Sequence, residues 1–155
     1  MSQENVELHR RLAEAFNRQD IEAFITALDP NVEYHSAITV PGGTAYHGHD
    51  GVRRYFGDFG DAWGDEFRVE PDAFFDLGED TLMFYVVHGR GQQSGADVAM
   101  PGAQVCRWRD GLLVYAKVYV HREDALKDLG ISEDAVKPIA PQHLGLSEQD
   151  AHADS

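Results

Sequence analysis

Three stretches in the first 60 residues repeat apolar side chains with the period of an α-helix. The first begins after Ser2, a helix-capping residue type, the second after Asp20, and the third near Asp50. In each stretch the apolar residues fall on one face of the helix that they predict. They are Leu8, Leu12 and Phe16, then Ile21, Phe24, Ile25 and Leu28, then Val52, Tyr55, Phe56 and Phe59. We therefore expect three helices, each buried along one face, with Asp29-Pro30 ending the second.

The chain between the second and third helices, and most of the chain after residue 65, follows other patterns. Residues 32–36 predict a short strand, and the glycines and proline of residues 37–49 predict an irregular loop. From residue 66 polar and apolar side chains alternate, which is the period of a strand with two different faces. The longer strands expected there run from residue 66 to a turn at 76–80, then over 81–90, 97–109 and 112–121.

Two local signals mark the end of this region. Asp110-Gly111 is a dipeptide typical of a two-residue hairpin turn. Residues 122–129 predict a short helix, and Gly130, which tolerates a positive φ, predicts where it ends. Helices followed by a meander of antiparallel strands predict an α+β fold, with the helices on one face of a curved sheet.

The length of 155 residues fits one domain, which we expect to span residues 1–136. Pro138, Pro141, Gly145 and the polar residues around them offer little to bury. Residues 137–155 are therefore predicted to form a loosely ordered acidic tail.

The formal net charge of -14 argues against nucleic acid or an anionic membrane as a partner, because the field of the protein would repel either one. The acidic residues are spread along the chain, which also fits a role in solubility alone. The single cysteine, Cys106, cannot form an internal disulfide. The N-terminus lacks a signal-peptide pattern and no apolar run approaches the ~20 residues that cross a bilayer, so we expect a cytoplasmic protein.

The strand at 81–90 carries the first candidate chemistry, because it is apolar at its start and polar at its end. Alternation places five of its residues on one side, namely Leu82, Phe84, Val86, His88 and Arg90, and Met83, Tyr85 and Val87 on the other. An imidazole and a guanidinium thus follow three apolar residues down one wall.

Three histidines raise the question of a metal. His47 and His49 lie two residues apart in the expected loop, and His35 precedes them on a strand. No carboxylate or cysteine spacing completes a known metal motif around them, and Asp50 as a helix cap explains the local pattern. We expect neither a metal nor a cofactor.

Segments in three parts of the chain resemble SnoaL-like proteins of the nuclear-transport-factor-2-like superfamily. They are residues 5–34, above all Ala15-Phe16-Asn17-Arg18-Gln19-Asp20 and Asp29-Pro30-Asn31-Val32-Glu33-Tyr34, then His47-Gly48-His49-Asp50-Gly51-Val52, and Trp108-Arg109-Asp110-Gly111 through Val118-Tyr119. The resemblance covers about residues 3–131 and implies a cone-shaped barrel that encloses one pocket. It also implies a homodimer formed through the outer sheet face, where Tyr115, Lys117 and Tyr119 suit a mixed interface. Trp63 and Trp108 are interpreted as packing or interface groups.

The superfamily includes ketosteroid isomerases, limonene epoxide hydrolases, scytalone dehydratases, polyketide cyclases and binding domains, so it does not imply one reaction. At the positions of the isomerase base and its two oxyanion donors this chain has Tyr34, Leu12 and Gln104. At the epoxide hydrolase positions it keeps Tyr34, with Ser36 for an Asn, while His88, Arg90 and Val118 replace the Arg and both Asp residues. The cyclase Asp also falls at Val118. The catalytic carboxylates of the family are therefore absent.

The resemblance implies a mostly apolar pocket with a few hydrogen-bonding groups, which describes a site for a small organic molecule. We predict His88 as acid or base, and Arg90 and Tyr34 as electrophilic partners, although each also fits a structural role. The other predicted pocket residues are Leu12, Ser36, Phe56, Phe84, Val86, Gln104, Cys106, Ala116, Val118 and Val120. Two hypotheses follow: a cofactor-independent isomerase, cyclase, dehydratase or hydrolase, or a non-catalytic small-molecule-binding or interaction domain.

Overall fold

The structure is a computed structural model that describes residues 3–37, 44–64, 66–90 and 97–141. The sheet has six strands in the order β2-β1-β6-β5-β4-β3, with β1 and β6 parallel and the other neighbours antiparallel. The elements in chain order are α1 (Glu4–Asn17), α2 (Ile21–Thr26), β1 (Leu28–Ser36), β2 (Thr44–His47), α3 (Gly48–Trp63), β3 (Phe67–Leu77), β4 (Asp80–Arg90), β5 (Asp97–Arg109), β6 (Leu112–Tyr119), α4 (Arg122–Leu129) and a 3-10 turn (Glu133–Ala135).

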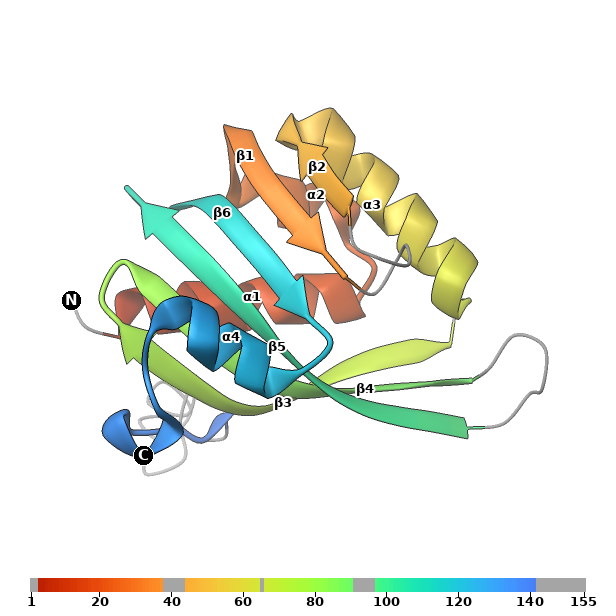
Figure 1. Cartoon of the computed structure of the whole chain (residues 1–155). Coiled ribbons are helices and arrows are strands. Elements are labelled where there is room, and N and C mark those ends of the chain that lie inside the picture. The colour runs from red at the N-terminus through yellow and green to blue at the C-terminus, as the bar shows by residue number, and fades with distance from the viewer. Residues whose placement is uncertain (1–2, 38–43, 65, 91–96, 142–155) are drawn as a thin grey trace, which may run out of the picture.

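The curved sheet has helices on both faces (Figure 1). Helices α1 and α3 pack against what we call the inner face, and the short helix α4 packs across β5 and β6 on the opposite, outer face. The prediction of an α+β fold with three N-terminal helices against one face of a curved sheet is confirmed, and α4 covers part of the other face. No helix among the described residues is long and apolar enough to span a membrane.

Each face of the sheet has its own apolar core. The inner core contains the apolar faces of α1, α2 and α3, and is rich in aromatic rings that meet edge to face or tilted. The outer core is smaller and lies beneath α4. Its buried members are Phe75, Leu82, Phe84, Ala103, Val105, Tyr119 and Ala125. Both sides of β4 are therefore buried.

Where the sequence carries a local signal for a helix start, a helix end or a turn, the structure agrees with the prediction. The Asp20 carboxylate accepts a hydrogen bond from the Ala23 N–H at 3.1 Å and caps α2. Gly130 takes a φ of 70° and ends α4, which spans the predicted residues. The Asp110-Gly111 turn has φ values of 55° and 81°, as a tight hairpin of this type requires. The predicted cap Ser2 lies outside the described residues.

Two boundaries differ from the predictions because strand pairing overrides the local pattern. Helix α2 ends at Thr26, three residues before Asp29, because Leu28 begins β1 and pairs with Leu113 of β6. The loop expected over residues 37–49 contains a strand, since β2 pairs antiparallel with β1 from Glu33↔His47 to Ser36↔Thr44. Its four residues lack the apolar alternation that would have indicated a strand.

Bulges change which residues share a face. The pairing of β5 with β6 shifts register next to Trp108, so Leu113 and Ala116 both belong to the inner core. Strict alternation would put Leu113 and Ala116 on opposite faces, and the register shift brings both to the inner one. In β3 a second shift, between Pro71 and Ala73, lets a proline remain inside a long strand.

Residues 137–141, the described part of the predicted tail, return to the sheet. Ile139 and Phe74 exchange two backbone hydrogen bonds of 2.7 and 2.9 Å, and the Ile139 side chain packs on the inner core. The other residues assigned to the tail, 142–155, lie outside the described part of the chain.

Gly102 provides a test of close packing in the sheet. A Cβ at this position would lie 2.6 Å from the Tyr85 hydroxyl oxygen and 2.9 Å from the Tyr119 carbonyl oxygen. We expect Gly102→Ala to lower the free energy of unfolding by about 1–3 kcal/mol, because the backbone has to shift. Urea denaturation measures this change.

The matched control is Gly57→Ala in α3, where a new Cβ meets no atom within 4 Å. Alanine favours the helix there, so the control should raise stability by up to about 1 kcal/mol. Equal effects of the two substitutions would contradict the packing described at Gly102.

Candidate functional site

A small cavity lies inside the cone, between the inner face of the sheet and helices α1 and α3. It offers about 30 Å³ to the centres of water molecules, room for about two of them. Most of its wall is apolar or aromatic. The lining residues are Leu12, Ala13, Phe16, Phe24, Tyr34, Tyr55, Phe59, Val69, Met83, Tyr85, Gln104 and Val118.

A chain of hydrogen bonds runs through the buried core beside this cavity. The Thr81 Oγ1 and the Nδ1 of His9 are 2.7 Å apart, and the His9 Nε2 is 2.9 Å from the Gln104 Oε1. The Gln104 Nε2 donates to the Tyr34 hydroxyl at 2.8 Å, and the Trp108 Nε1 donates to Thr81 at 2.9 Å. The chain thus connects α1 with strands β1, β4 and β5.

The direction of each hydrogen bond follows from two groups, the Trp108 N–H, which can only donate, and the Gln104 carbonyl oxygen, which can only accept. Thr81 therefore accepts from Trp108. Because the Gln104 oxygen accepts from His9, a neutral His9 keeps its Nδ1 unprotonated, and that nitrogen accepts from the Thr81 hydroxyl. The other ring nitrogen of His9 then carries the proton and donates to the Gln104 carbonyl oxygen, which leaves the Gln104 amide to donate to Tyr34. Every member of the chain is neutral.

The chain continues on the other side of Tyr34. The Tyr34 and Tyr55 hydroxyls are hydrogen-bonded, and Tyr55 is also bonded to Ser36. Burial raises the pKa of Tyr34 well above its usual value, and it raises the pKa of Tyr55 to about 12. Both phenols therefore stay protonated at neutral pH.

His9 sits at the centre of this chain and is fully buried. Burial lowers its pKa from 6.5 to about 4, although the hydrogen bond with Gln104 acts in the opposite direction. The Cys106 sulfur lies 3.5 Å from the His9 Nε2, and burial raises the pKa of that thiol. Neither group is ionised at neutral pH, so this pair does not form an activated thiolate.

The predicted pocket residues fall into two groups in the structure. Four of them, Leu12, Tyr34, Gln104 and Val118, line the cavity. The others on this side of the sheet or on the helices above it are buried in the core next to the cavity. They are Ser36, Phe56, Cys106 and Ala116.

The predicted residues of β4 lie on the wrong side of the sheet. Met83 and Tyr85 line the cavity, whereas Phe84 belongs to the outer core and lies 4.8 Å from the guanidinium carbon of Arg122. Val86, which pairs with Glu70 and shares the Phe84 side of β4, also leaves the pocket set. The alternation was right, but both sides of β4 are apolar and a strand pattern cannot choose between them. Val120 follows the end of β6 and lines a shallow surface hollow beside α4.

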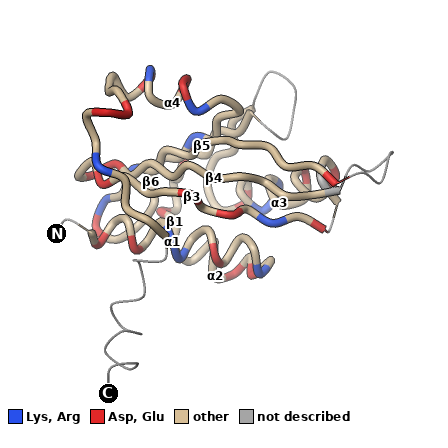
Figure 2. The backbone as a smooth tube through the Cα atoms, turned by 90° about the horizontal axis from the view of Figure 1, so that it is seen from below, with Lys and Arg blue, Asp and Glu red and all other residues tan. Residues whose placement is uncertain are grey.

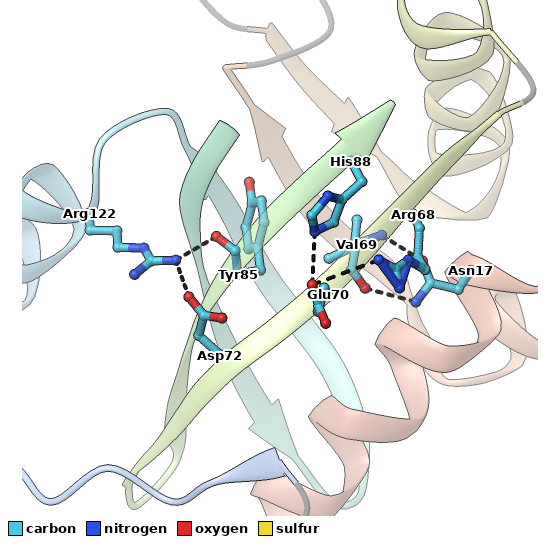
Figure 3. A network of polar contacts seen from close by, with 8 residues as sticks. All are labelled: Asn17, Arg68, Val69, Glu70, Asp72, Tyr85, His88 and Arg122. Carbon is cyan, nitrogen blue, oxygen red and sulfur yellow. Dashed lines mark hydrogen bonds and ion pairs between the residues drawn. The ribbon is translucent and has the colours of Figure 1, made fainter. Parts of the chain in front are cut away.

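The predicted catalytic set does not converge. The His88 ring is 39% exposed on the outer face, where its Nε2 lies 2.8 Å from the Glu70 Oε1 (Figure 3). Arg68, beside it on β3, lies 3.7 Å from the same carboxylate oxygen. Tyr34 is buried on the inner side. The Arg90 side chain lies outside the described part of the structure.

The prediction missed His9 and Thr81 of the hydrogen-bond chain and the lining residues Ala13, Phe16, Phe24, Tyr55, Phe59, Val69, Met83 and Tyr85. His9 had a detectable signal, because it lies three residues before Leu12 and four before Ala13 on the buried stripe of α1. A histidine on an apolar helix face needs hydrogen-bond partners inside the fold. Which partners it finds depends on strands 72 to 97 residues away.

Two of the three histidines considered for a metal have other partners. The His35 Nε2 lies 2.6 Å from Glu33, and the His49 Nε2 lies 2.9 Å from the Leu28 carbonyl oxygen. Within the residues that the structure describes, no group of three His, Cys, Asp or Glu side chains is arranged to hold a metal.

Comparison with solved structures defines the class of fold. An NTF2-like protein of unknown function from Burkholderia pseudomallei superposes with a TM-score of 0.69 at 23% identity, over 82% of this chain and 97% of that one. The protein TerC, co-crystallised with polyporic acid, superposes with a TM-score of 0.67 at 20% identity, over 81% of this chain and 96% of that one. A candidate polyketide cyclase from Xanthomonas campestris gives 0.62 at 20% identity, over 77% and 92%. The fold is thus NTF2-like.

A family-level match is more specific than the fold. A sequence model described as the SnoaL-like domain matches residues 9–116, which is well over half of the chain. The chain therefore belongs to the SnoaL-like domain family. Among curated proteins, none matches the sequence.

The buried His9 predicts a specific loss of stability in acid. Its pKa is about 4 in the folded chain and near 6.5 when exposed, so the unfolded chain binds the proton first as the pH falls. The stabilisation from a neutral His9 is complete above about pH 6.5 and is lost between there and pH 4, by about 3 kcal/mol. Measuring urea denaturation for the wild type and His9→Gln at pH 7, 5.5 and 4 isolates this effect.

The difference between the two proteins should shrink toward pH 4, because carboxylates contribute equally to both. The groups that face His9 are Thr81, Gln104, Cys106, Phe74 and Trp108, and none of them titrates in this range. Parallel pH profiles would show that His9 is not held neutral by burial.

Proposed function

We propose that the protein binds a small, uncharged and largely apolar molecule in the cavity between the sheet and α1 and α3. The observation that carries this proposal is the wall of the cavity, where aromatic rings from three helices surround a few neutral hydrogen-bonding groups. Sites for small organic molecules have this composition. The TerC structure with polyporic acid supports the idea that this fold accommodates small organic ligands.

The absence of charge at the wall favours an uncharged ligand. The described lining residues include no Asp, Glu, Lys or Arg, and the nearest titratable ring, His9, is neutral. A carboxylate or ammonium group entering this space would lose its hydration without gaining a counter-charge, which is strongly unfavourable. The net charge of -14 on the chain adds to the penalty for an anion.

The cavity has to enlarge before it holds an organic molecule. About 30 Å³ for water centres is too little for an aromatic ring together with its substituents. Met83, which lines the wall, has an unbranched and flexible side chain that can repack at low cost. We infer that binding occurs with rearrangement of the wall around Met83, and that small single-ring molecules are favoured.

The alternative is a cofactor-independent isomerase, cyclase, dehydratase or hydrolase. The similarity to a candidate polyketide cyclase favours it, and donors such as Tyr34 and Gln104 could polarise a carbonyl group. A general base is harder to assign. His9 has a pKa of about 4 and both of its nitrogens are hydrogen-bonded, while His88 lies on the outer face. We therefore favour ligand binding over catalysis as the proposed function.

We also propose a homodimer through the part of the outer face that α4 leaves open. Helix α4 already uses Lys117 and Tyr119 of the predicted interface, since Asp128 accepts from both, at 3.4 and 2.8 Å. The remaining part is centred on Tyr115, whose ring lies 5.6 Å from the Arg107 guanidinium. Sedimentation equilibrium should give a dimer for the wild type and a monomer for Tyr115→Asp. A monomeric wild type contradicts the proposal.

The binding proposal is tested with ethylbenzene and phenylacetate, which have one ring each and differ in charge. Ethylbenzene should raise the melting temperature of the wild type and phenylacetate should not, because the site offers no counter-charge. Ala13→Leu places three more carbons in the cavity and should abolish the ethylbenzene shift. The control, Ala23→Leu, adds the same atoms at an exposed position of α2 and should keep the shift.

An unchanged shift in Ala13→Leu, or no shift in the wild type, would rule out this cavity as the site. The alternative is tested on the same protein with a panel of epoxides, enones and polyketide-like esters. Turnover of any of them that Ala13→Leu removes and Ala23→Leu keeps would favour the enzyme over the binding protein.

A further inference from the structure

Tyr85 differs from the other polar residues of the cavity wall. It lies on the inner side of β4, is 3% exposed and lines the cavity. The hydroxyls of Tyr34 and Tyr55 belong to the hydrogen-bond chain through Gln104 and Ser36. No residue in the described part of the chain hydrogen-bonds to the Tyr85 hydroxyl. Because no fully buried side-chain N or O atom in the described chain lacks a partner, this hydroxyl is open to the cavity that Tyr85 lines and is not enclosed by packed atoms.

The sheet is built to hold the Tyr85 ring in this position. Gly102 lies directly opposite on β5, and the ring occupies the space that a side chain at Gly102 would fill, since a Cβ there would be 2.7 Å from the ring carbon bearing the hydroxyl. The ring therefore lies across the backbone of β5. A larger residue opposite Tyr85 would displace the hydroxyl from the wall.

Arg122 fixes the backbone of both strands from the outer side. Its Nη2 donates to the Tyr85 carbonyl oxygen at 2.7 Å and to the Asp72 carboxylate at 2.8 Å (Figure 3). Its Nε donates to the Gly102 carbonyl oxygen at 3.1 Å. One guanidinium thus connects the two residues that set the position of the ring, and the hydroxyl is held at a defined point of the wall.

We propose that the Tyr85 hydroxyl recognises the ligand by donating a hydrogen bond to an uncharged acceptor oxygen, of the ketone, quinone or ester class. This inference rests on the proposed binding function and identifies the polar contact of the same cavity. A phenol hydroxyl that is open to a cavity and has no partner in the described chain can bond to a ligand oxygen without breaking another hydrogen bond. The other polar groups of the wall already have partners, so a ligand would have to break their bonds to use them.

The chemistry of the hydroxyl decides which ligand atom it prefers. Burial raises the pKa of Tyr85, so the phenol keeps its proton and acts as a donor. The cavity has room for a water molecule at this point when no ligand is bound. A hydrocarbon would remove that water and replace none of its hydrogen bonds, whereas a carbonyl oxygen replaces one. The site should therefore distinguish a ketone from a hydrocarbon of the same size.

The experiment compares acetophenone with ethylbenzene, which differ in one oxygen, by isothermal titration calorimetry on the full chain. The wild type should bind acetophenone roughly tenfold more tightly than ethylbenzene, the value of one buried hydrogen bond. Tyr85→Phe should reduce this preference to near unity by weakening acetophenone binding alone. Tyr119→Phe, which removes a hydroxyl from the outer core, should keep the preference.

A second measurement separates recognition from a structural role. Removing the unused hydroxyl in Tyr85→Phe should leave the melting temperature unchanged or higher, whereas Tyr34→Phe should lower it because Gln104 loses an acceptor. If Tyr85→Phe melts well below the wild type, or binds acetophenone as the wild type does, the inference about Tyr85 is wrong while the binding function stands. If neither probe binds the wild type, the binding function fails and the inference with it.

Discussion

The interior of this protein depends on a chain of neutral polar groups that hydrogen-bond to one another away from bulk water. A fully buried histidine would be strongly unfavourable in an aromatic core without partners for both ring nitrogens, and here Thr81 and Gln104 supply them. The same bonds attach α1 to β4 and β5. Gln104 also donates to Tyr34 on β1. A shift of β4 or β5 by one residue would therefore leave several buried groups without their partners. Burial of these groups therefore helps to select the register of the sheet as well as the chemistry of the cavity.

The parts of the fold that were predictable from the sequence are those with a local physical cause. A carboxylate next to a free N–H caps α2 at Asp20, and the positive φ values of Asp110-Gly111 and Gly130 set a turn and a helix end. The features that failed depend on a partner distant in the chain. Thr44–His47 becomes a strand because β1 lies beside it, and Leu113 faces inward because of a bulge opposite Trp108. Neither cause is visible in the segment itself. Acidic and basic residues are interspersed along α1 and α4 (Figure 2), and no Asp, Glu, Lys or Arg of the described chain is buried.

The residues of the candidate site were also predictable only in part. Tyr34, Gln104 and Val118 were predicted from a resemblance to functional positions of related proteins, and all three line the cavity. The β4 residues were assigned to the wrong side because α4 covers the outer face and buries Phe84 as fully as the inner core buries Met83 and Tyr85. Because both sides of β4 carry apolar residues, the alternation pattern cannot show which side faces the cavity. The polar end of the strand then directed attention to His88, which the structure pairs with Glu70 at the surface.

The lack of charged side chains among the described lining residues and the neutral hydrogen-bond chain beside them have a common physical consequence. Carboxylates near this cavity would raise the pKa of His9 and draw water inward, whereas the amide, phenols and hydroxyls found here are compatible with a dry aromatic wall. The interior is thus better suited to holding a neutral molecule than to moving a proton. The backbone fixes the position of the side chains in the cavity wall. On the outer side, Arg122 donates hydrogen bonds to the carbonyl oxygens of both Tyr85 and Gly102. Because Arg122 is the first residue of α4, the docking of that helix and the shape of the cavity wall are set by the same side chain.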